Sequence, residues 1–276
     1  PLYFDRSMFC VNSEAATERP PIEWNKLETP WRSNGNNYTK EILLENLKGV
    51  VWTFKKSYMD RPWTHHVKRS NQAVVVMMGD SKAMQWVTHA DEYARSLNAS
   101  FMVATRPQTD RAETFISHYI PDSMPEEMAK YPFRMMFICG RIASTMESSF
   151  QGTVSYWSKA ASCVIVMPDN VNWPYEPNYC LKNNPIEQCT LPESRTDKNH
   201  TTEKFWRSLR QRESHVKENS EFLTMNDMIC FGGNETRCHT HLGNIPVYMD
   251  WSHYSEQFIN LARPFFFNKL MNTRCH

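Results

Sequence analysis

The sequence has no hydrophobic run long enough to cross a membrane and no large excess of charge of either sign. Its longest apolar run, residues 73–78, has the length of a strand, whereas a transmembrane helix needs ~18 or more consecutive apolar residues. The 31 Lys and Arg residues nearly balance the 30 Asp and Glu residues, for a net charge of +1. A nucleic-acid-binding protein concentrates positive charge on one face. This balance therefore argues against nucleic acid as a partner.

The sequence also lacks a Cys-x-x-Cys pair, which weakens a zinc-site interpretation. Its eight cysteines include two close pairs in loop-like sequence rich in Asn, Pro and Gly: Cys180 with Cys189, and Cys230 with Cys238. These pairs predict short disulfide-closed loops, and hence an oxidising compartment such as the secretory lumen or the cell exterior. Cys139 and Cys163 lie inside apolar runs and are expected to be buried thiols. We expect no metal and no cofactor.

No signal peptide is visible, and the chain begins at Pro1. We therefore expect a processed chain or a piece of a longer protein, and the missing targeting segment carries no information about location. Four Asn-x-Ser/Thr sequons are compatible with a glycoprotein, although composition alone predicts nearly as many: Asn37, Asn98, Asn199 and Asn234.

A chain of 276 residues suits one large domain that carries an extension. Residues 1–70 are rich in Pro, Asn, Trp and Arg and have weak periodicity. We expect them to form an N-terminal extension that packs on a catalytic domain of residues 71–276. Within the extension, residues 41–47 predict a short helix and residues 50–54 a short strand.

From residue 72 onward, short apolar runs alternate with amphipathic segments. The apolar runs predict strands at residues 73–78, 100–104, 134–139, 162–167 and 245–249. Helices are expected at residues 83–97, 112–119, 125–130, 202–217 and 255–270, with one more ending at residue 161. The alternation predicts a three-layer α/β/α fold with a mostly parallel five-stranded sheet, as in flavodoxin-like proteins. Residues 168–197 are expected to be a long surface loop.

The most informative stretch is residues 74–83, in which a buried strand leads through Gly79-Asp80-Ser81 into a helix. Gly79 permits a tight turn at the carboxyl end of a strand, where open α/β sheets bind ligands. Ser81 then falls at the helix N-terminus, whose free N–H groups and dipole stabilise negative charge. An acyl-transfer nucleophile beside part of an oxyanion hole has these requirements. The alternative is an ordinary turn with Ser81 as the N-cap.

Of the ten histidines, His253 has the best setting for a general base. It lies between a short strand and the last amphipathic helix, three residues after Asp250. One loop can then present both the imidazole and the carboxylate that fixes its tautomer, as in a Ser-His-Asp triad. The alternative is a capping Asp250 beside an exposed His253. Five other histidines are expected to lie at the surface, although the spacing of the last two also suggests a metal: His65, His66, His276, His239 and His241.

The two segments together resemble the outer signatures of the SGNH (GDSL-like) hydrolase fold: Gly-Asp-Ser after the first strand and Asp-x-x-His before the last helix. The closer resemblance is to the SGNH domain of acyltransferase-3-type membrane O-acyltransferases, particularly nematode-like ones. The matching segments are residues 79–83, 228–238, 246–255 and 261–266. The resemblance covers residues 72–267 and rests on the order, spacing and setting of these segments.

Two residues of the usual oxyanion hole of this fold have no counterpart in this sequence. No glycine occurs between Ser81 and Gly140, and the usual third-block asparagine is missing. The resemblance implies that the N–H groups of Ser81 and Gly140, together with Arg141, are the oxyanion donors. Removal of one such donor typically costs about 10²–10³ in rate, so an incomplete set predicts slow or absent turnover. Lys82 replaces a frequent His and Tyr254 a frequent Leu, and neither change is expected to disturb the triad.

The resemblance implies that Ser81 takes an acyl group, most simply acetyl, from an ester and passes it to a carbohydrate hydroxyl. The chain would be the lumenal or extracellular domain of a membrane acyltransferase. Its expected partners are an acylated small molecule or glycan and its own membrane acyltransferase domain. Two alternatives are a secreted carbohydrate O-acetylesterase and a catalytically inactive module that binds a glycan or a protein. Trp173 and Tyr175 are candidates for stacking on sugar rings.

Overall fold

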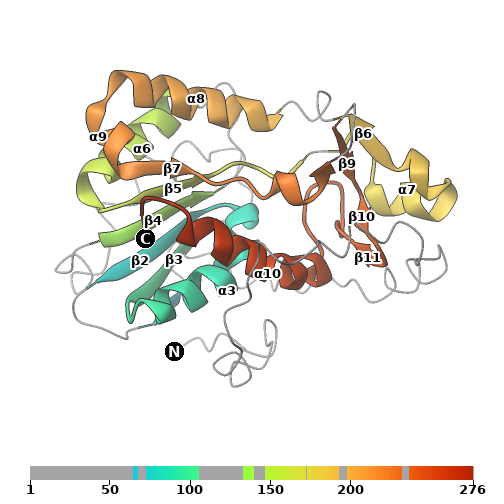
Figure 1. Ribbon diagram of the computed structural model, residues 1–276, viewed down its shortest axis with the longest axis horizontal. Coiled ribbons are helices and arrows are strands. Elements are labelled where there is room, and N and C mark those ends of the chain that lie inside the picture. The colour runs from blue at the N-terminus through green and yellow to red at the C-terminus, as the bar shows by residue number, and fades with distance from the viewer. Residues whose placement is uncertain are drawn as a thin grey trace.

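A central sheet is built from the apolar runs of the sequence. The computed structural model describes residues 65–67, 73–105, 133–139, 147–171, 173–192, 198–231 and 236–275. The sheet has the strand order β1 (His65–Val67), β3 (Ser100–Thr105), β2 (Val74–Gly79), β4 (Phe133–Cys139), β5 (Val164–Met167) and β7 (Ser220–Phe222). Strand β1 is antiparallel to β3, whereas the other strands pair in parallel. The predicted mostly parallel sheet is confirmed, with an antiparallel strand added at one edge (Figure 1).

Strand β2 lies inside the sheet, and all of its residues are buried. It contains no polar side chain, which is typical of a parallel strand covered on both faces. Successive side chains point to opposite faces. Val75 and Met77 pack into one hydrophobic cluster, whereas Val74, Val76 and Met78 pack into another. The sheet therefore needs a helical layer on each face.

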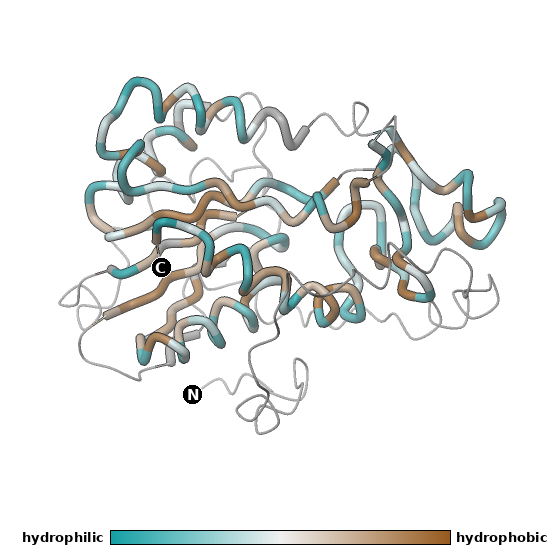
Figure 2. The backbone as a smooth tube through the Cα atoms, in the orientation of Figure 1, coloured by the Kyte–Doolittle hydropathy of each residue, from teal (hydrophilic) through white to brown (hydrophobic). Residues whose placement is uncertain are grey.

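Helices supply both layers (Figure 1): α3 (Ser81–Ser96) and α10 (Glu256–Met271) on one face, and α6 (Glu147–Ala160), α8 (Lys198–Arg212) and α9 (Ser214–Asn219) on the other. On the first face, Trp86 of α3 stacks on Phe266 of α10, with ring centroids 5.4 Å apart. On the second, Trp157 of α6 and Trp206 of α8 share one cluster. Figure 2 shows the hydrophobic strands between these more polar helices. The predicted α/β/α layering is confirmed.

The fifth parallel strand is not at the predicted position. Only Ile245–Pro246 of residues 245–249 forms a strand, β11, and it pairs with β10 (His241–Leu242) outside the main sheet. Strand β7 takes the fifth place, beside β5. Pro246 has no N–H to donate to a ladder, which disfavours this run as a sheet strand. Strand β7 has the sequence Ser-Glu-Phe, and three residues with two polar side chains give almost no strand signal.

The segment expected to be a long loop carries short elements of its own: α7 (Pro177–Asn183), the 3₁₀ turn η5 (Ile186–Gln188) and β6 (Thr190–Pro192). Strand β6 joins β9 (Arg237–His239) and β8 (Cys230–Phe231) in an antiparallel sheet, and the 3₁₀ turn η7 (Asn226–Met228) precedes β8. The two predicted disulfides, Cys180–Cys189 and Cys230–Cys238, are both present here. These small elements lie at one end of the main sheet (Figure 1).

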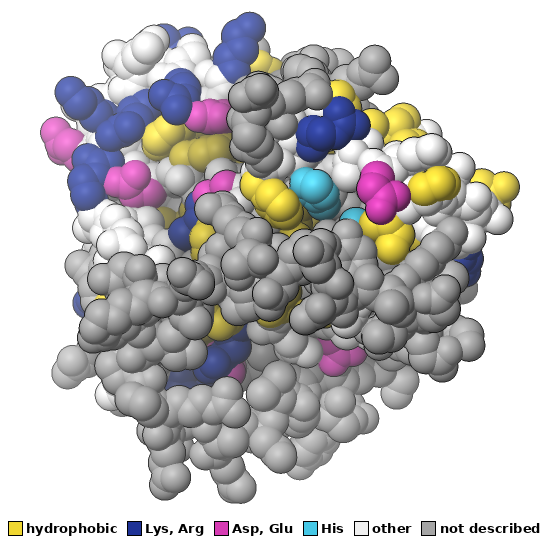
Figure 3. All heavy atoms as spheres, turned by 45° about the vertical axis from the view of Figure 1, so that its right-hand side comes forward, with side chains coloured by type: hydrophobic (Ala, Val, Ile, Leu, Met, Phe, Trp, Pro, Cys, Tyr) yellow, Lys and Arg dark blue, Asp and Glu magenta, His cyan; other side chains and the backbone are white. Residues whose placement is uncertain are grey.

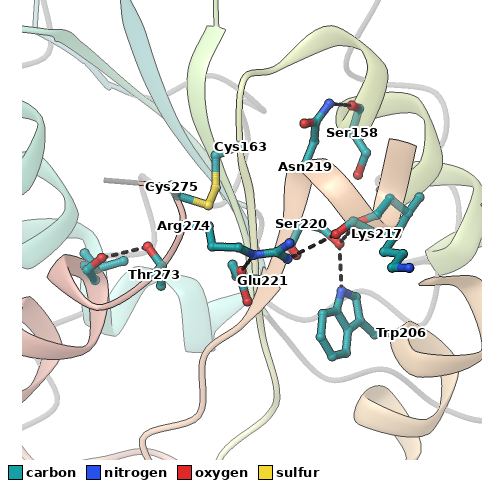
Figure 4. The surroundings of a disulfide bond; sticks show 12 residues. Ser158, Cys163, Trp206, Lys217, Asn219, Ser220, Glu221, Thr273, Arg274 and Cys275 are labelled. Carbon is teal, nitrogen blue, oxygen red and sulfur yellow. Dashed lines mark hydrogen bonds and ion pairs between the residues drawn. A yellow bond between two sulfur atoms is a disulfide. The ribbon is translucent and has the colours of Figure 1, made fainter. Parts of the chain in front are cut away.

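A third disulfide contradicts one sequence prediction. Cys163 is bonded to Cys275 and is not a free thiol, whereas Cys139 is a buried free cysteine as expected. The bond ties the start of β5 to the C-terminal end of α10 (Figure 4). Next to it, Arg274 forms an ion pair with Glu221 of β7. The pairing was not predicted because 112 residues separate the two cysteines and only the tertiary structure brings them together.

Several predictions fall outside the described residues: the helix at residues 41–47, the strand at 50–54, the helices at 112–119 and 125–130, and both Gly140 and Arg141. The expected boundary of the N-terminal extension stays a prediction, although strand β1 comes from its last residues. In the part of the chain that the structure describes, no helix has the length and hydrophobicity required to span a membrane.

Candidate active site

The turn that leads into the site requires glycine at its first position. Gly79 ends β2 with φ at +147°, a conformation that other residues rarely adopt. A Cβ at this position would lie 1.6 Å from the carbonyl oxygen of Cys139, at the end of the neighbouring strand β4. The close approach of the two strand ends allows the chain to turn at once into α3.

Asp80, not Ser81, is the N-cap of α3. Its Oδ1 accepts a hydrogen bond of 2.8 Å from the backbone N–H of Lys82, and Ser81 is the first helical residue. The alternative in which Ser81 merely caps the helix is therefore wrong. Because Asp80 satisfies the cap, the Ser81 hydroxyl is available for another partner. Its Oγ lies 2.8 Å from Nε2 of His253.

His253 and Asp250 complete a continuous hydrogen-bonded chain with Ser81. Nδ1 of His253 lies 2.7 Å from Oδ2 of Asp250 and 3.5 Å from Oγ of Ser252, whereas Nε2 is the nitrogen that faces Ser81. The other carboxylate oxygen, Oδ1, accepts the backbone N–H groups of Ser252 and His253, each at 2.8 Å. The Asp250 carboxylate therefore binds two backbone N–H groups of its own loop through one oxygen and the His253 imidazole through the other. All three predicted residues thus meet in one place.

Electrostatics favour the charged form of Asp250. Burial by itself raises the pKa of a carboxyl group, but the hydrogen bond from the His253 side chain and the one from the Ser252 amide outweigh it. The charge of His253 adds to the effect, and the pKa of Asp250 is lowered from its ordinary value. An ionised Asp250 can only accept hydrogen bonds, so its carboxylate favours a proton on Nδ1 of His253, and Nε2 is the nitrogen that faces the Ser81 hydroxyl.

A buried lysine stands directly beside the nucleophile. The Lys82 side chain points into the protein, where its ammonium group lies 3.7 Å from Oδ1 of Asp169 and donates to the carbonyl oxygen of Ser252. Burial lowers the pKa of Lys82, and the charge of Asp169 opposes that shift, followed by the charges of Asp80 and Asp250. Lys82 was expected only to leave the triad undisturbed. The sequence alone did not indicate that its ammonium group is buried and contacts the loop that carries His253.

Asp169 and Asn170 were not predicted as site residues. They follow β5 after Pro168 and are buried, and Asn170 donates a hydrogen bond to the loop that carries His253. The only sequence signal was two polar residues at the carboxyl end of a predicted parallel strand, the edge at which such sheets place functional groups. The oxyanion donors of Gly140 and Arg141 lie outside the described residues and stay predictions. The Ser81 amide, the third donor, belongs to the first residue of α3.

The aromatic residues around the site differ from the expected ones. Trp173 is only 4% exposed and packs edge-on against Tyr248, so its face is not offered to a ligand. Tyr175 is partly buried against the core. Trp251, which follows Asp250, is 43% exposed and is the large aromatic residue that reaches solvent next to the triad. On the face in Figure 3, exposed hydrophobic side chains lie beside histidine, with basic and acidic side chains close by.

His239 and His241 were both expected at the surface, and this expectation is wrong for His241. His241 is buried, and burial lowers its pKa to about 4, with the charge of His239 acting in the same direction and Glu187 opposing it. Burial also lowers the pKa of His239, whose ring stacks on Phe231. No group of three or more His, Cys, Asp or Glu side chains within the described ranges is arranged to hold a metal ion.

Comparison with known proteins assigns the family. The family described as "SGNH domain (fused to AT3 domains)" matches residues 55–268. The chain belongs to this family. Among solved structures, a lipopolysaccharide acetyltransferase periplasmic domain from Salmonella ser. Paratyphi A is similar, at 13% identity and a TM-score of 0.45, over 75% of this chain and 84% of that chain. A search of curated proteins finds no sequence that matches.

The family match confirms the resemblance deduced from the Gly-Asp-Ser and Asp-x-x-His segments. Both segments lie inside the matched range, as do strands β2 to β7 and most of α10. The match begins at residue 55 and therefore takes in strand β1 as well. An SGNH domain of this family is consistent with an acyltransferase or esterase activity. The roles of individual residues follow as proposals.

Proposed function

We propose that this SGNH domain transfers an acyl group through a covalent intermediate on Ser81. The observation that carries the proposal is the hydrogen-bonded chain from Ser81 Oγ to His253 Nε2, 2.8 Å, and from His253 Nδ1 to Asp250, 2.7 Å. A serine hydroxyl is a weak nucleophile unless an adjacent base removes its proton. An oriented imidazole at hydrogen-bond distance meets that need, and the carboxylate behind it stabilises the imidazolium that forms.

In the first half of the reaction, Oγ of Ser81 attacks the carbonyl carbon of an acyl ester while His253 Nε2 takes the hydroxyl proton. The tetrahedral intermediate collapses, the ester C–O bond breaks, and the departing alcohol takes the proton from His253. In the second half, His253 removes a proton from an acceptor hydroxyl, whose oxygen attacks the acyl carbon. Ser81 then leaves with the proton from His253, which restores the starting state.

The negative charge of the two tetrahedral intermediates needs N–H donors. We assign this role to the N–H group of Ser81, at the positive end of α3, and to Gly140 N–H and Arg141, which follow β4 in sequence. Strand β4 neighbours β2 in the sheet, with Cys139 opposite Gly79. The carbonyl group of Cys139 thus lies next to the turn that presents Ser81.

The acceptor decides between transferase and esterase, because water and a sugar hydroxyl compete for the same acyl-enzyme. We favour transfer, most simply of acetyl, to a carbohydrate hydroxyl. Two observations support it: the family is one whose domains are fused to AT3 domains, and Trp251, which is 43% exposed, places an aromatic side chain next to the triad. In this proposal a membrane acyltransferase domain of the same protein supplies the acyl group. The three disulfides fit a lumenal or extracellular location.

A fluorophosphonate probe tests the nucleophile. The wild-type chain is expected to be labelled, and the Ser81→Ala variant is not. His253→Gln is expected to lower the labelling rate by about 10³-fold or more, because the members of a triad act as a unit. The Ser96→Ala variant, at the far end of the same helix, is the matched control and should be labelled like wild type. If folded wild-type protein is never labelled, the chain is a binding module and the proposal is wrong.

The acceptor is tested separately with p-nitrophenyl acetate as donor. Release of nitrophenol is followed with and without added saccharides, and acetylated sugar is measured by mass spectrometry. Formation of acetyl-sugar that depends on Ser81 supports transfer. Nitrophenol release with acetate as the sole acyl product supports the esterase alternative.

A further inference from the structure

The peptide bond that precedes His253 is held from both sides by buried side chains outside the triad. The carbonyl oxygen of Ser252 accepts a hydrogen bond from the ammonium group of Lys82 and a second, of 2.9 Å, from Nδ2 of Asn170. A carbonyl oxygen has two lone pairs, and both are engaged here. The orientation of this peptide group is therefore fixed just before the imidazole.

The peptide bond that follows His253 is held by the same network. The N–H of Tyr254 donates to Oε1 of Gln85 at 3.2 Å. This oxygen also accepts a hydrogen bond of 3.1 Å from Nδ2 of Asn170, the amide group that contacts Ser252. Because both partners donate to it, the Gln85 side chain must present its oxygen and not its nitrogen at this position.

The network is almost sealed from solvent. Its charged end is the pair of Lys82 and Asp169, which are 4% and 2% exposed, and Oδ1 of Asp169 also accepts the backbone N–H of Asn170 at 2.8 Å. Gln85 and Asn170 are likewise buried. Hydrogen bonds in so dry an environment are stronger than in water and leave few alternative geometries.

The placement of these residues connects the base to the nucleophile by a short rigid route. Lys82 and Gln85 lie three residues apart on α3 and hence on neighbouring positions of one helix face. Ser81, the first residue of the same helix, precedes them. Asn170 reaches the loop from the end of β5. The helix that carries Ser81 therefore also provides two side chains, Lys82 and Gln85, that form hydrogen bonds with the backbone on either side of His253.

We propose that Lys82, Gln85 and Asn170 are positioning residues, which hold the His253 loop so that Nε2 meets the Ser81 hydroxyl. This inference rests on the proposed acyl-transfer function and adds to it the residues that set the geometry of the triad. The three side chains contact the backbone of the loop. They do not touch the reacting atoms.

A purely stabilising role does not explain this choice of residues. A buried ion pair gains little over apolar side chains of the same volume, because both charges lose their hydration. Methionine at position 82 would fill a similar volume without that cost. What the ammonium and the two amides add is direction, since each hydrogen bond constrains an atom of the loop to a small region. Displacement of a reacting group by about 1 Å can cost 10²-fold in rate.

The double variant Lys82→Met with Asp169→Asn tests the proposal. It removes the ammonium without leaving an unpaired buried carboxylate, and asparagine keeps an oxygen for the Asn170 N–H. The second-order rate of fluorophosphonate labelling is expected to fall by about 10–100-fold in folded protein. In proton NMR, the far-downfield resonance of the proton shared by His253 and Asp250 is expected to broaden or shift.

His89→Leu is the matched control. His89 is buried on α3 and forms a hydrogen bond of 2.8 Å to the carbonyl oxygen of Ile259 in α10, so it also joins α3 to the C-terminal segment, without contact to the His253 loop. This variant is expected to lower the melting temperature and to keep the wild-type labelling rate and resonance. A role in stability alone would make the double variant behave in the same way, which would overturn the inference.

Two further results separate the possible failures. If the double variant does not fold, Gln85→Met is the second test, because it removes the two hydrogen bonds that Gln85 accepts from Tyr254 and Asn170. The labelling rate is expected to fall about fivefold, the effect of losing the one bond that Gln85 makes to the loop itself. An unchanged rate in that variant contradicts the inference. If wild type is never labelled, the acyl-transfer proposal fails. The His253–Asp250 resonance then still decides whether the network positions the loop.

Discussion

At the residue scale, the position of the nucleophile depends on what its two predecessors do. Gly79 lets the ends of β2 and β4 approach each other more closely than any side chain would permit, and Asp80 caps α3. Ser81 is then both helical and uncommitted to the cap. Its hydroxyl points to His253. The tripeptide has three different roles at three consecutive positions, and each depends on the preceding one.

Gly79→Ala is expected to reduce the free energy of unfolding by about 3 kcal/mol or more, because the Cβ would overlap the Cys139 carbonyl and φ would be strained. Urea denaturation measures the loss. Gly152→Ala is the control: Gly152 lies in α6, and a Cβ there meets nothing within 4 Å. That variant is expected to be more stable by about 0.5–1 kcal/mol, as for any glycine in a helix interior. A tolerated Gly79→Ala would contradict the described turn.

At the element scale, the strands beside the main sheet are only two or three residues long, yet they bury one histidine side chain and partly bury another. Strands β9 and β10 carry His239 and His241, and burial favours the neutral form of both imidazoles. The disulfide between Cys230 and Cys238 joins two residues that lie opposite each other in adjacent strands. Cross-links of this kind replace the hydrophobic core that so small a sheet lacks.

His241 makes stability depend on pH. The pKa of His241 is lowered from 6.5 to about 4 in the folded chain, so between these values the unfolded state binds more protons. The contribution of His241 to the free energy of unfolding is fully present above about pH 6.5. It is lost as the pH drops toward 4, by up to about 3 kcal/mol. Urea denaturation at pH 7 and pH 4.5 should show a smaller loss in His241→Gln than in wild type. Equal losses would mean that His241 is solvated.

At the scale of the whole molecule, the C-terminal segment both completes the site and closes the fold. The loop that precedes α10 supplies Asp250 and His253, and the end of α10 is joined through Cys275 to the start of β5. The site lies at one end of the parallel strands and the disulfide at the other. The disulfide therefore lies at the end of the sheet opposite to the site. Removal of this cross-link does not directly change any contact of the triad.

Loss of the long-range disulfide is expected to cost more stability than loss of a local one. In the chain-entropy description, the bond between Cys163 and Cys275, 112 residues apart, contributes about 4–5 kcal/mol, whereas the bond between Cys180 and Cys189, 9 residues apart, contributes about 2–3 kcal/mol. Urea denaturation of the two Cys→Ala pairs compares them. The labelling rate of Ser81 is expected to stay unchanged in the folded Cys163→Ala, Cys275→Ala variant. A larger loss from the local pair would contradict this account.

The sequence by itself determined the features that depend on neighbouring residues. The apolar run before Gly79, the Gly79-Asp80-Ser81 turn and the following helix are local patterns, as is the Asp250-x-x-His253 spacing. Together they predicted the fold class and the triad candidates. Two disulfides were predictable for the same reason, since fewer than ten residues separate their cysteines. The family match confirms the fold and family that these patterns indicated.

Only the tertiary structure decided which distant residues meet. Lys82 and the Ser252 carbonyl are 170 positions apart, and a lysine after Gly-Asp-Ser gives no sequence signal for a buried ammonium. The burial of Trp173, the fifth place of β7 and the Cys163–Cys275 bond depend in the same way on packing across the sheet. Patterns along a chain report which face of an element is apolar. Which partner that face finds is determined by the free energy of the whole packed core.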